Sequence, residues 1–215
     1  MGRRGASGDL HDGPSGGGKN PEKKYGQPGT PQVPPTASIR GQVGEKGKPV
    51  QAGVAIKKVN PNINSEYADY SENCQRCVVA YELNRRGYKV EAESTYKSDP
   101  YPKGNNWTKA FKNAKLESVG AGTTAKVNEK ITQKMKGWGE GSRGIVRVNY
   151  NKTSGHVFNV EYRNGKLHYY DAQVGIRYDP KKVFNHVVKS NVQIMRSDNL
   201  ALNGDVTKMV RKRRK

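Results

Sequence analysis

The stretch that most constrains the fold runs from residue 155 to residue 175, where two runs rich in Val, Phe and Tyr flank the pair Asn164-Gly165. An Asn-Gly pair between such runs is a strong hairpin signal, because a type I′ turn needs positive φ at both central residues. A two-residue loop at this point pairs Arg163 with Lys166. The register then follows outward along both strands.

This register predicts which side chains share a face of the hairpin. It places His156 opposite Gln173, and strand alternation puts both on the same face as Asp171. His156 and Asp171 become diagonal neighbours, roughly 7–8 Å apart at the backbone and within side-chain reach. His168 falls opposite Glu161 on the reverse face. The hairpin therefore offers a base and an orienting carboxylate on a rigid sheet, and lacks only a nucleophile.

Two cysteines, Cys74 and Cys77, are the only thiols in the chain. They lie in the first turn of a predicted helix that has Asn73 as its N-cap and Gly87 just past its C-terminus. A helix N-terminus stabilises a thiolate, which is the nucleophilic form of cysteine. We therefore expect His156, rather than a histidine on the reverse face, to face this helix.

Other interpretations of the Cys-x-x-Cys pattern stay open. Zinc would need two further ligands, and the four histidines include no His-x3–5-His pair. A thioredoxin-like redox pair normally follows a strand, whereas residues 67–73 make a poor strand. One or both thiols could also be buried in the core. Spacing alone does not choose between Cys74 and Cys77, and nothing in the chain indicates a metal or a cofactor.

Composition divides the chain into parts. The net charge is +20, only 33% of residues are hydrophobic, and there are 25 glycines and 11 prolines. We expect residues 1–50 to be a disordered Gly/Pro-rich basic arm, residues 51–200 to form one domain, and residues 201–215 to be a basic tail. The positive charge also suggests a non-enzymatic alternative, a basic protein that binds nucleic acid or associates with a virion.

Further elements complete an α+β layout. Apolar residues at 50–59 suggest an edge strand, and residues 88–92, 144–150 and 191–196 suggest strands. Helical spacing of Val127, Ile131 and Met135 predicts a helix that begins at residue 123 or 124 and runs to residue 136. A short helix is expected over 181–189. Either Trp107 or Trp138 could line a cleft, although core packing suits both.

Three ordered motifs resemble a known family. The motifs are Asn73-Cys-Gln-Arg-Cys-Val-Val-Ala-Tyr-Glu-Leu-Asn-Arg-Arg-Gly-Tyr-Lys-Val-Glu-Ala92, Gly155-His-Val-Phe-Asn-Val160 and Tyr170-Asp-Ala-Gln-Val-Gly175. Together they resemble the papain-fold toxin family, also called Tox-PL or glutamine-deamidase-like toxins, in its phage or mobile-element setting. The resemblance implies a papain-like cysteine-hydrolase fold over residues 51–200, with a Cys-bearing helix packed on an antiparallel sheet.

The same resemblance implies a function and a set of site residues. The family's Cys, His and Asp fall on Cys74, His156 and Asp171, with Cys77 as the other candidate nucleophile. The glutamine that papain uses for its oxyanion has no counterpart before Cys74, so either Gln173 or Gln75 could serve the oxyanion with backbone N–H groups, and Gln173 could instead support the histidine. The implied activity is cysteine-dependent amide hydrolysis, either deamidation of protein Gln or Asn or peptide cleavage, by a toxin, effector or phage-associated protein. The implied partners are a protein substrate and an immunity protein.

Targeting signals are weak. No run approaches the roughly 18 apolar residues that a membrane span needs, and no apolar segment follows Arg3 and Arg4. We therefore expect no signal peptide and no membrane partner, and a protein that is cytoplasmic, delivered to its target, or virion-associated.

Overall fold

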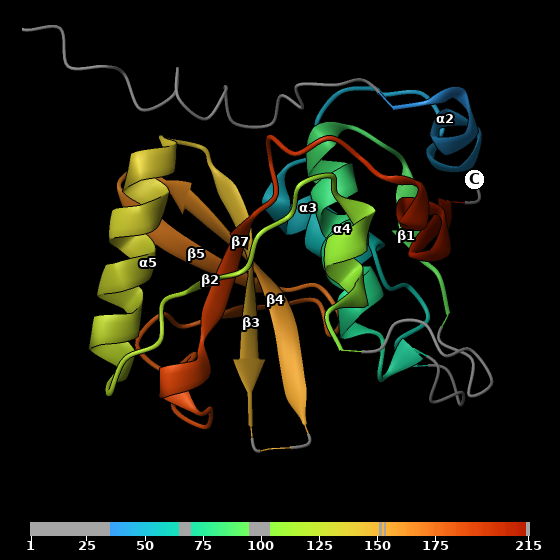
Figure 1. The fold of residues 1–215 in the computed structure, drawn as a ribbon. Coiled ribbons are helices and arrows are strands. Elements are labelled where there is room, and N and C mark those ends of the chain that lie inside the picture. Colours follow the sequence, from blue (N-terminus) through green and yellow to red (C-terminus); the bar gives the residue numbers. More distant parts are fainter. Residues whose placement is uncertain (1–34, 65–69, 95–103, 151, 153, 214–215) are drawn as a thin grey trace, which may run out of the picture.

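The computed structural model describes residues 35–64, 70–94, 104–150, 152 and 154–213, and a six-stranded antiparallel sheet lies at the centre of the fold. In the order in which they lie side by side, its strands are β2 (Glu117–Ser118), β7 (Gln193–Arg196), β3 (Arg143–Asn149), β4 (Gly155–Arg163), β5 (Lys166–Asp171) and β6 (Ile176–Tyr178). Helix α4 (Cys74–Arg86) lies against one face and α5 (Thr124–Trp138) against the other (Figure 1). The predicted α+β layout, with a Cys-bearing helix on an antiparallel sheet, is confirmed.

Smaller elements complete the described part of the fold. A separate two-stranded sheet pairs β1 (Val90–Ala92) with β8 (Val210–Lys212). The remaining helical elements are α2 (Ala37–Val43), α3 (Ala52–Lys58) and the 3-10 helices η2 (Asn106–Ala110), η3 (Lys189–Asn191) and η4 (Gly204–Lys208). None of the helices in the described ranges has both the length and the apolar character that a bilayer crossing requires.

The hairpin turn has the predicted geometry. Asn164 and Gly165 have φ angles of 51° and 69°, and Arg163 pairs with Lys166. Pairing between β4 and β5 ends at Asn159 with Tyr170, however, so the predicted pairing of His156 with Gln173 is wrong.

The reason lies after the end of β5. The Gly175 N–H donates to the Asp171 carbonyl at 2.9 Å, which turns the chain into β6 before Gln173 can continue the ladder. His156 pairs instead with Val148 of β3.

Two apolar clusters fill the space on either side of the sheet. Side chains at alternate positions of β4 enter different clusters: Val157 packs on the α4 side, whereas Phe158 and Val160 pack on the α5 side. On α5, the predicted face of Val127, Ile131 and Met135 is fully buried. Because side chains of the central strands alternate between the two faces, the same strands pack against both α4 and α5.

Two local predictions are wrong. Residues 52–58, expected within an edge strand, form α3, because the buried residues Ala52, Ala55, Ile56 and Val59 follow helical spacing. Residues 181–189, expected as a helix, form successive turns that begin with the Lys182 and Val183 N–H groups donating to Asp179 O. Both are short segments in which tertiary packing outweighs local propensity.

The expected boundaries also differ at both ends of the chain. Residues 1–34 lie outside the described residues, but α2, expected within the disordered arm, buries Ile39 and Val43. Over 201–213 the expected tail is ordered, because η4 buries Val206 and β8 pairs with β1. In β8, Arg211 contacts Glu91 at 2.7 Å, so this cation serves the fold.

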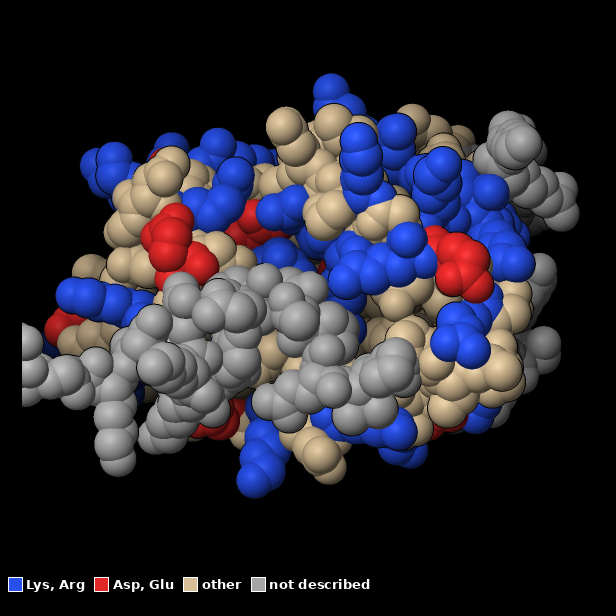
Figure 2. Space-filling view, turned by 90° about the horizontal axis from the view of Figure 1, so that it is seen from above, with Lys and Arg blue, Asp and Glu red and all other residues tan. Residues whose placement is uncertain are grey.

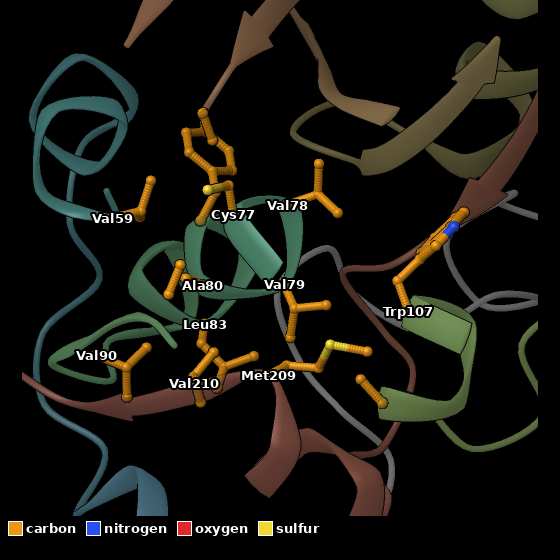
Figure 3. Packing of buried hydrophobic residues seen from close by; sticks show 14 of the residues in the cluster. Val59, Cys77, Val78, Val79, Ala80, Leu83, Val90, Trp107, Met209 and Val210 are labelled. Atoms are coloured by element: carbon orange, nitrogen blue, oxygen red, sulfur yellow. The ribbon is translucent and has the colours of Figure 1, made fainter. Parts of the chain in front are cut away.

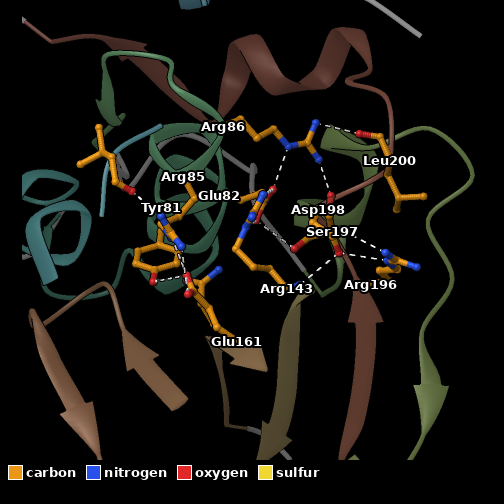
Figure 4. Close-up of polar contacts among 12 residues, drawn as sticks. Tyr81, Glu82, Arg85, Arg86, Arg143, Glu161, Arg196, Ser197, Asp198 and Leu200 are labelled. Atoms are coloured by element: carbon orange, nitrogen blue, oxygen red, sulfur yellow. Dashed lines mark hydrogen bonds and ion pairs between the residues drawn. The ribbon is translucent and has the colours of Figure 1, made fainter. Parts of the chain in front are cut away.

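Helix α4 is anchored by buried charges as well as by apolar contacts (Figure 4). Arg85 donates to Glu161 of β4 at 2.6 Å, and the Tyr81 hydroxyl donates to the same carboxylate at 2.8 Å. The helix ends at Gly87, whose φ of 104° suits glycine. Its first residue is thereby held at a fixed place relative to the sheet.

Candidate active site

The structure brings Cys74, His156 and Asp171 together. Nε2 of His156 lies 2.7 Å from Oδ2 of Asp171, and Cys74 is hydrogen-bonded to the same imidazole. Because Asp171 occupies Nε2, Nδ1 is the ring nitrogen left for the sulfur. The thiol, the ring and the carboxylate form a continuous hydrogen-bonded chain.

The charges within this chain support one another. Burial alone would lower the pKa of His156, but its hydrogen bonds to Asp171 and Cys74 and their negative charge raise it to about 10. Burial would raise the pKa of Asp171, but hydrogen bonds from His156, Tyr178 and the Gln173 backbone hold it below its ordinary value. At neutral pH the ring is therefore protonated and the carboxylate ionised.

The second thiol, Cys77, has a different environment. Its side chain is completely buried in the α4-side cluster, among residues such as Val59 and Ala80 (Figure 3). Burial raises the pKa of the Cys77 thiol well above its ordinary value. Cys74, one turn earlier, is partly exposed. The structure therefore separates an accessible thiol beside the histidine from a buried thiol in the core.

The contact between His156 and α4 is made only at the start of the helix. Along β4, Asn159 donates to the Val78 carbonyl and therefore faces the body of α4. His156 alternates with Phe158, which belongs to the cluster on the α5 side. His156, predicted to face α4, thus lies on the face of the sheet opposite the body of α4. As the second residue of β4, however, it lies at the end of the strand where α4 begins (Figure 1).

Asp171 has a third partner that the sequence analysis missed. The Tyr178 hydroxyl donates to Oδ2 of Asp171 at 2.5 Å, and the Gln173 backbone N–H donates to Oδ1 at 3.0 Å. Tyr178 comes from β6, and its ring packs edge-on against Phe158 at a centroid distance of 5.4 Å. A short strand after Gly175 would have been the only signal in the sequence, and it is too short to predict from its pattern.

The side chain of Gln173 lies outside the cleft. Its Nε2 donates to the Ser71 carbonyl, in the loop that leads into α4. The buried Asn60 side chain donates to the Tyr70 and Gln173 carbonyls at 3.0 and 2.8 Å. Gln173 and Asn60 therefore connect the turn after Asp171 to the segment before Cys74, which fixes the distance between the two halves of the site.

A cleft of about 250 Å³ opens beside Cys74 and His156. Its wall comes mainly from the ends of β3 and β4; the lining residues are Cys74, Gln75, Gly104, Arg147, Val148, Asn149, Lys152, Ser154, Gly155, His156 and Val157. Gln75 accepts a hydrogen bond from the Trp107 backbone N–H at 3.3 Å through Oε1, which leaves Nε2 as a donor. A larger cavity of about 760 Å³, next to α5 and β5, includes none of the three hydrogen-bonded groups.

The other sequence candidates have structural positions. Trp107 is fully buried and Trp138 is 5% exposed, so both belong to the core rather than to the cleft. The reverse-face histidine, His168, pairs with Glu161 in the predicted register and lies by the Arg163 carbonyl. Within the described ranges, no group of three or more His, Cys, Asp and Glu side chains is arranged to hold a metal ion.

A helix that presents a thiol at its N-terminus, packed on an antiparallel sheet that supplies a histidine and an aspartate, defines the papain-like class of folds. Within this class, residues 72–176 match the family model described as papain fold toxin 1, glutamine deamidase. The matched segment contains the three motifs, and the matching family is the one that they resemble. Searches of curated proteins and of solved structures found no significant match.

Proposed function

We propose that this chain is a cysteine-dependent glutamine deamidase that acts on protein substrates. The single observation that carries the proposal is the hydrogen-bonded chain from Cys74 through His156 to Asp171, with the thiol opening into a cleft. The family match over residues 72–176 supports the same chemistry. In this proposal Cys74 is the nucleophile, His156 the acid and base, and Asp171 the group that holds the imidazole.

The first half of the reaction forms a thioester. The Cys74 sulfur attacks the carbonyl carbon of the glutamine side-chain amide, and the C=O π bond opens to an oxyanion. As the tetrahedral species collapses, its C–N bond breaks and His156 gives its proton to the nitrogen, which leaves as ammonia. Asp171 stabilises the imidazolium without taking its proton.

The second half releases glutamate. His156, now neutral, takes a proton from a water molecule that attacks the thioester carbonyl. The C–S bond breaks, the thiolate re-forms and the side chain leaves as a carboxylic acid. A peptide bond could meet the same thiolate, but peptide cleavage would create new chain termini, whereas deamidation leaves the chain intact.

The oxyanion needs donors beside Cys74, and the start of α4 offers them. Backbone N–H groups in the first turn of a helix have no intrahelical partner. Gln75 lines the cleft with Nε2 as its remaining donor, so we assign it this role in place of Gln173, whose amide donates to Ser71. Replacing Gln75 by leucine is expected to lower kcat about a hundredfold.

Activity is tested by ammonia release and by a mass increase of about one dalton on glutamine-containing proteins. Wild type and Cys77→Ala should be active, and Cys74→Ala inactive. Iodoacetamide at pH 6 provides a substrate-free check, because a thiolate paired with His156 should react much faster than a cysteine of pKa ~8.5. If loss of Cys74 changes neither the activity nor the alkylation rate, the mechanism is wrong.

The toxin designation of the family leads to a proposal about biology. We infer that the activity acts on proteins of a target cell and that an immunity protein protects the producer, while phage or virion association stays a prediction. The check is growth of cells expressing wild type or Cys74→Ala. Growth arrest that depends on Cys74 supports a toxin, and equal growth contradicts it.

A non-enzymatic alternative rests on charge. The chain carries a net charge of +20, and Lys and Arg side chains spread over the face in Figure 2, interrupted by few acidic groups. Nucleic-acid binding through this charge would weaken steeply with salt. Such binding in a variant that lacks both thiols, together with no measurable deamidation by wild type, would favour the alternative.

A further inference from the structure

Most buried and half-buried arginines in the described residues meet a carboxylate. The ion pairs are Arg85 and Arg163 with Glu161, Arg86 and Arg143 with Glu82, Arg196 with Asp198, and Arg211 with Glu91. Arg147 is half-buried as well, but its Nη1 donates to the neutral Gln193 amide oxygen at 3.0 Å. No acidic side chain in the described ranges forms an ion pair with it.

Arg147 also lines the cleft that contains Cys74 and His156. A guanidinium has five N–H donors, and two of them can bind one carboxylate in parallel. Among the described residues Arg147 has one side-chain hydrogen bond, to Gln193, so it retains donors for a ligand. Its position in β3 is fixed by pairing with Val157 on one side and Gln193 on the other, so the charge is held in place on the cleft wall.

A second cation lies on the same wall. Lys152, in the connection between β3 and β4, lines the cleft and is exposed. The described residues that line the cleft include no Asp or Glu. The wall formed by the β3–β4 hairpin is therefore positively charged close to the reacting groups.

We infer that the cleft selects glutamines that have acidic neighbours in the substrate chain. This inference rests on the proposed deamidase function. Arg147 binds the carboxylate of a flanking Asp or Glu while the glutamine amide meets Cys74, and Lys152 attracts further negative charge. The same carboxylate chemistry occurs in free glutamine, but its ammonium group would be repelled by these cations, so the structure favours an acidic protein segment.

The test uses peptides of equal length with one central glutamine. One has Glu on both sides, one has Ala and one has Lys, and free glutamine is the fourth substrate. Full-length wild type is expected to turn over the Glu-flanked peptide with a kcat/KM about tenfold above that of the Ala-flanked peptide, and less in high salt. The Lys-flanked peptide and free glutamine should be the poorest substrates.

Variants then test whether the preference for acidic neighbours depends on Arg147 and Lys152 of the cleft wall. Arg147→Gln, which keeps an amide able to bond Gln193, and Lys152→Glu should each reduce the ratio of Glu-flanked to Ala-flanked turnover. Lys126→Glu, at an exposed position on α5, makes the same charge change as Lys152→Glu away from the cleft and should leave the ratio unchanged. Circular dichroism and Cys74 alkylation rates establish that each variant is folded.

The outcomes separate this inference from the function it rests on. Equal turnover of Glu- and Ala-flanked peptides, or a preference that survives Arg147→Gln, overturns the inference and leaves the deamidase standing. Peptide binding to Cys74→Ala, measured by fluorescence anisotropy, tests the charge selection in the event that no peptide is deamidated. Arg147-dependent binding of the Glu-flanked peptide without ammonia release from any peptide contradicts the deamidase and retains the charge selection. If there is no ammonia release and no selective binding, both the deamidase and the charge selection are overturned.

Discussion

The two ends of α4 differ in how their polar groups are partnered. Toward the C-terminal end, Glu82 is fully buried and accepts hydrogen bonds from Arg86, Arg143 and Ser197 at 2.8 to 3.2 Å (Figure 4). Burial would raise the pKa of Glu82, but Arg143 and Arg86 lower it to about 2. Glu82 therefore has its counter-charges within the protein.

The N-terminal end is left partly open. Cys74 is half-buried and bonded to His156, the side chain of Asn73 donates to the Glu93 carbonyl rather than capping the helix, and Arg147 across the cleft has no described acidic partner. α5 differs, because its N-cap Thr123 accepts from the Lys126 N–H. The closed end of α4 holds the fold, and the open end leaves hydrogen-bond donors and a partly exposed thiol beside the cleft.

The largest expected effect separates the two thiols on this helix. Cys74→Ala should reduce the proposed deamidation about 10⁴-fold with little change in stability, because it removes the proposed nucleophile. Cys77→Ala should retain activity and lose about 1 kcal/mol of unfolding free energy, since it removes buried atoms from the core. Ammonia release measures the activity of each variant, and urea denaturation measures its stability. Loss of activity in Cys77→Ala alone would reverse the assignment.

Breaking the closed end should cost stability. Glu82→Gln leaves Arg86 and Arg143 buried without their counter-charge, and we expect a loss of about 3–5 kcal/mol in unfolding free energy. Glu117→Gln is the matched control, because Glu117 is 49% exposed in its pair with Lys134 and should change stability by less than about 1 kcal/mol. Equal effects in thermal denaturation would contradict the distinction between buried and exposed pairs.

A smaller effect follows from the charge of His156. Its pKa is about 10 in the folded protein and about 6.5 in the unfolded chain. Between these values the folded state binds more protons, so this contribution is complete below pH 6.5 and is lost as pH rises toward 10. We expect a loss on the order of 2 kcal/mol over this window in wild type and a flatter profile in His156→Gln, measured by urea denaturation. If wild type and His156→Gln lose stability in parallel as pH rises, the pairing of a protonated His156 with Asp171 is contradicted.

The smallest expected effect concerns Tyr178. Tyr178→Phe removes one donor from Asp171, which raises the pKa of that carboxyl and should move the acid limb of the kcat profile to higher pH, with activity about tenfold lower. Tyr169→Phe is the control, because its hydroxyl donates to Asn128 at 2.8 Å, away from the site. A KM effect with an unmoved pH profile would mean that Tyr178 acts only through packing.

Much of the candidate site was predictable because its signals are local. The Asn164-Gly165 turn determines the register near the loop, and alternation carries His156 and Asp171 to one face. The Gly87 terminus and the first-turn position of Cys74 follow from helix rules that need only a few neighbouring residues. Contacts made by Asn60 and Arg147 join segments far apart in the chain, and no local pattern indicates them. The contact of Tyr178 with Asp171 is closer in sequence, but it depends on β6, a strand too short to predict.

The sequence by itself determined the α+β class of the fold, the hairpin turn, and His156 and Asp171 as candidate site residues, since each depends on turn chemistry or on the period of a helix or strand. Only the tertiary structure distinguished the two thiols, because burial depends on what packs against α4. It also decided where Gln173 points and what holds Asp171. These choices depend on how distant segments pack together, which local propensity does not specify.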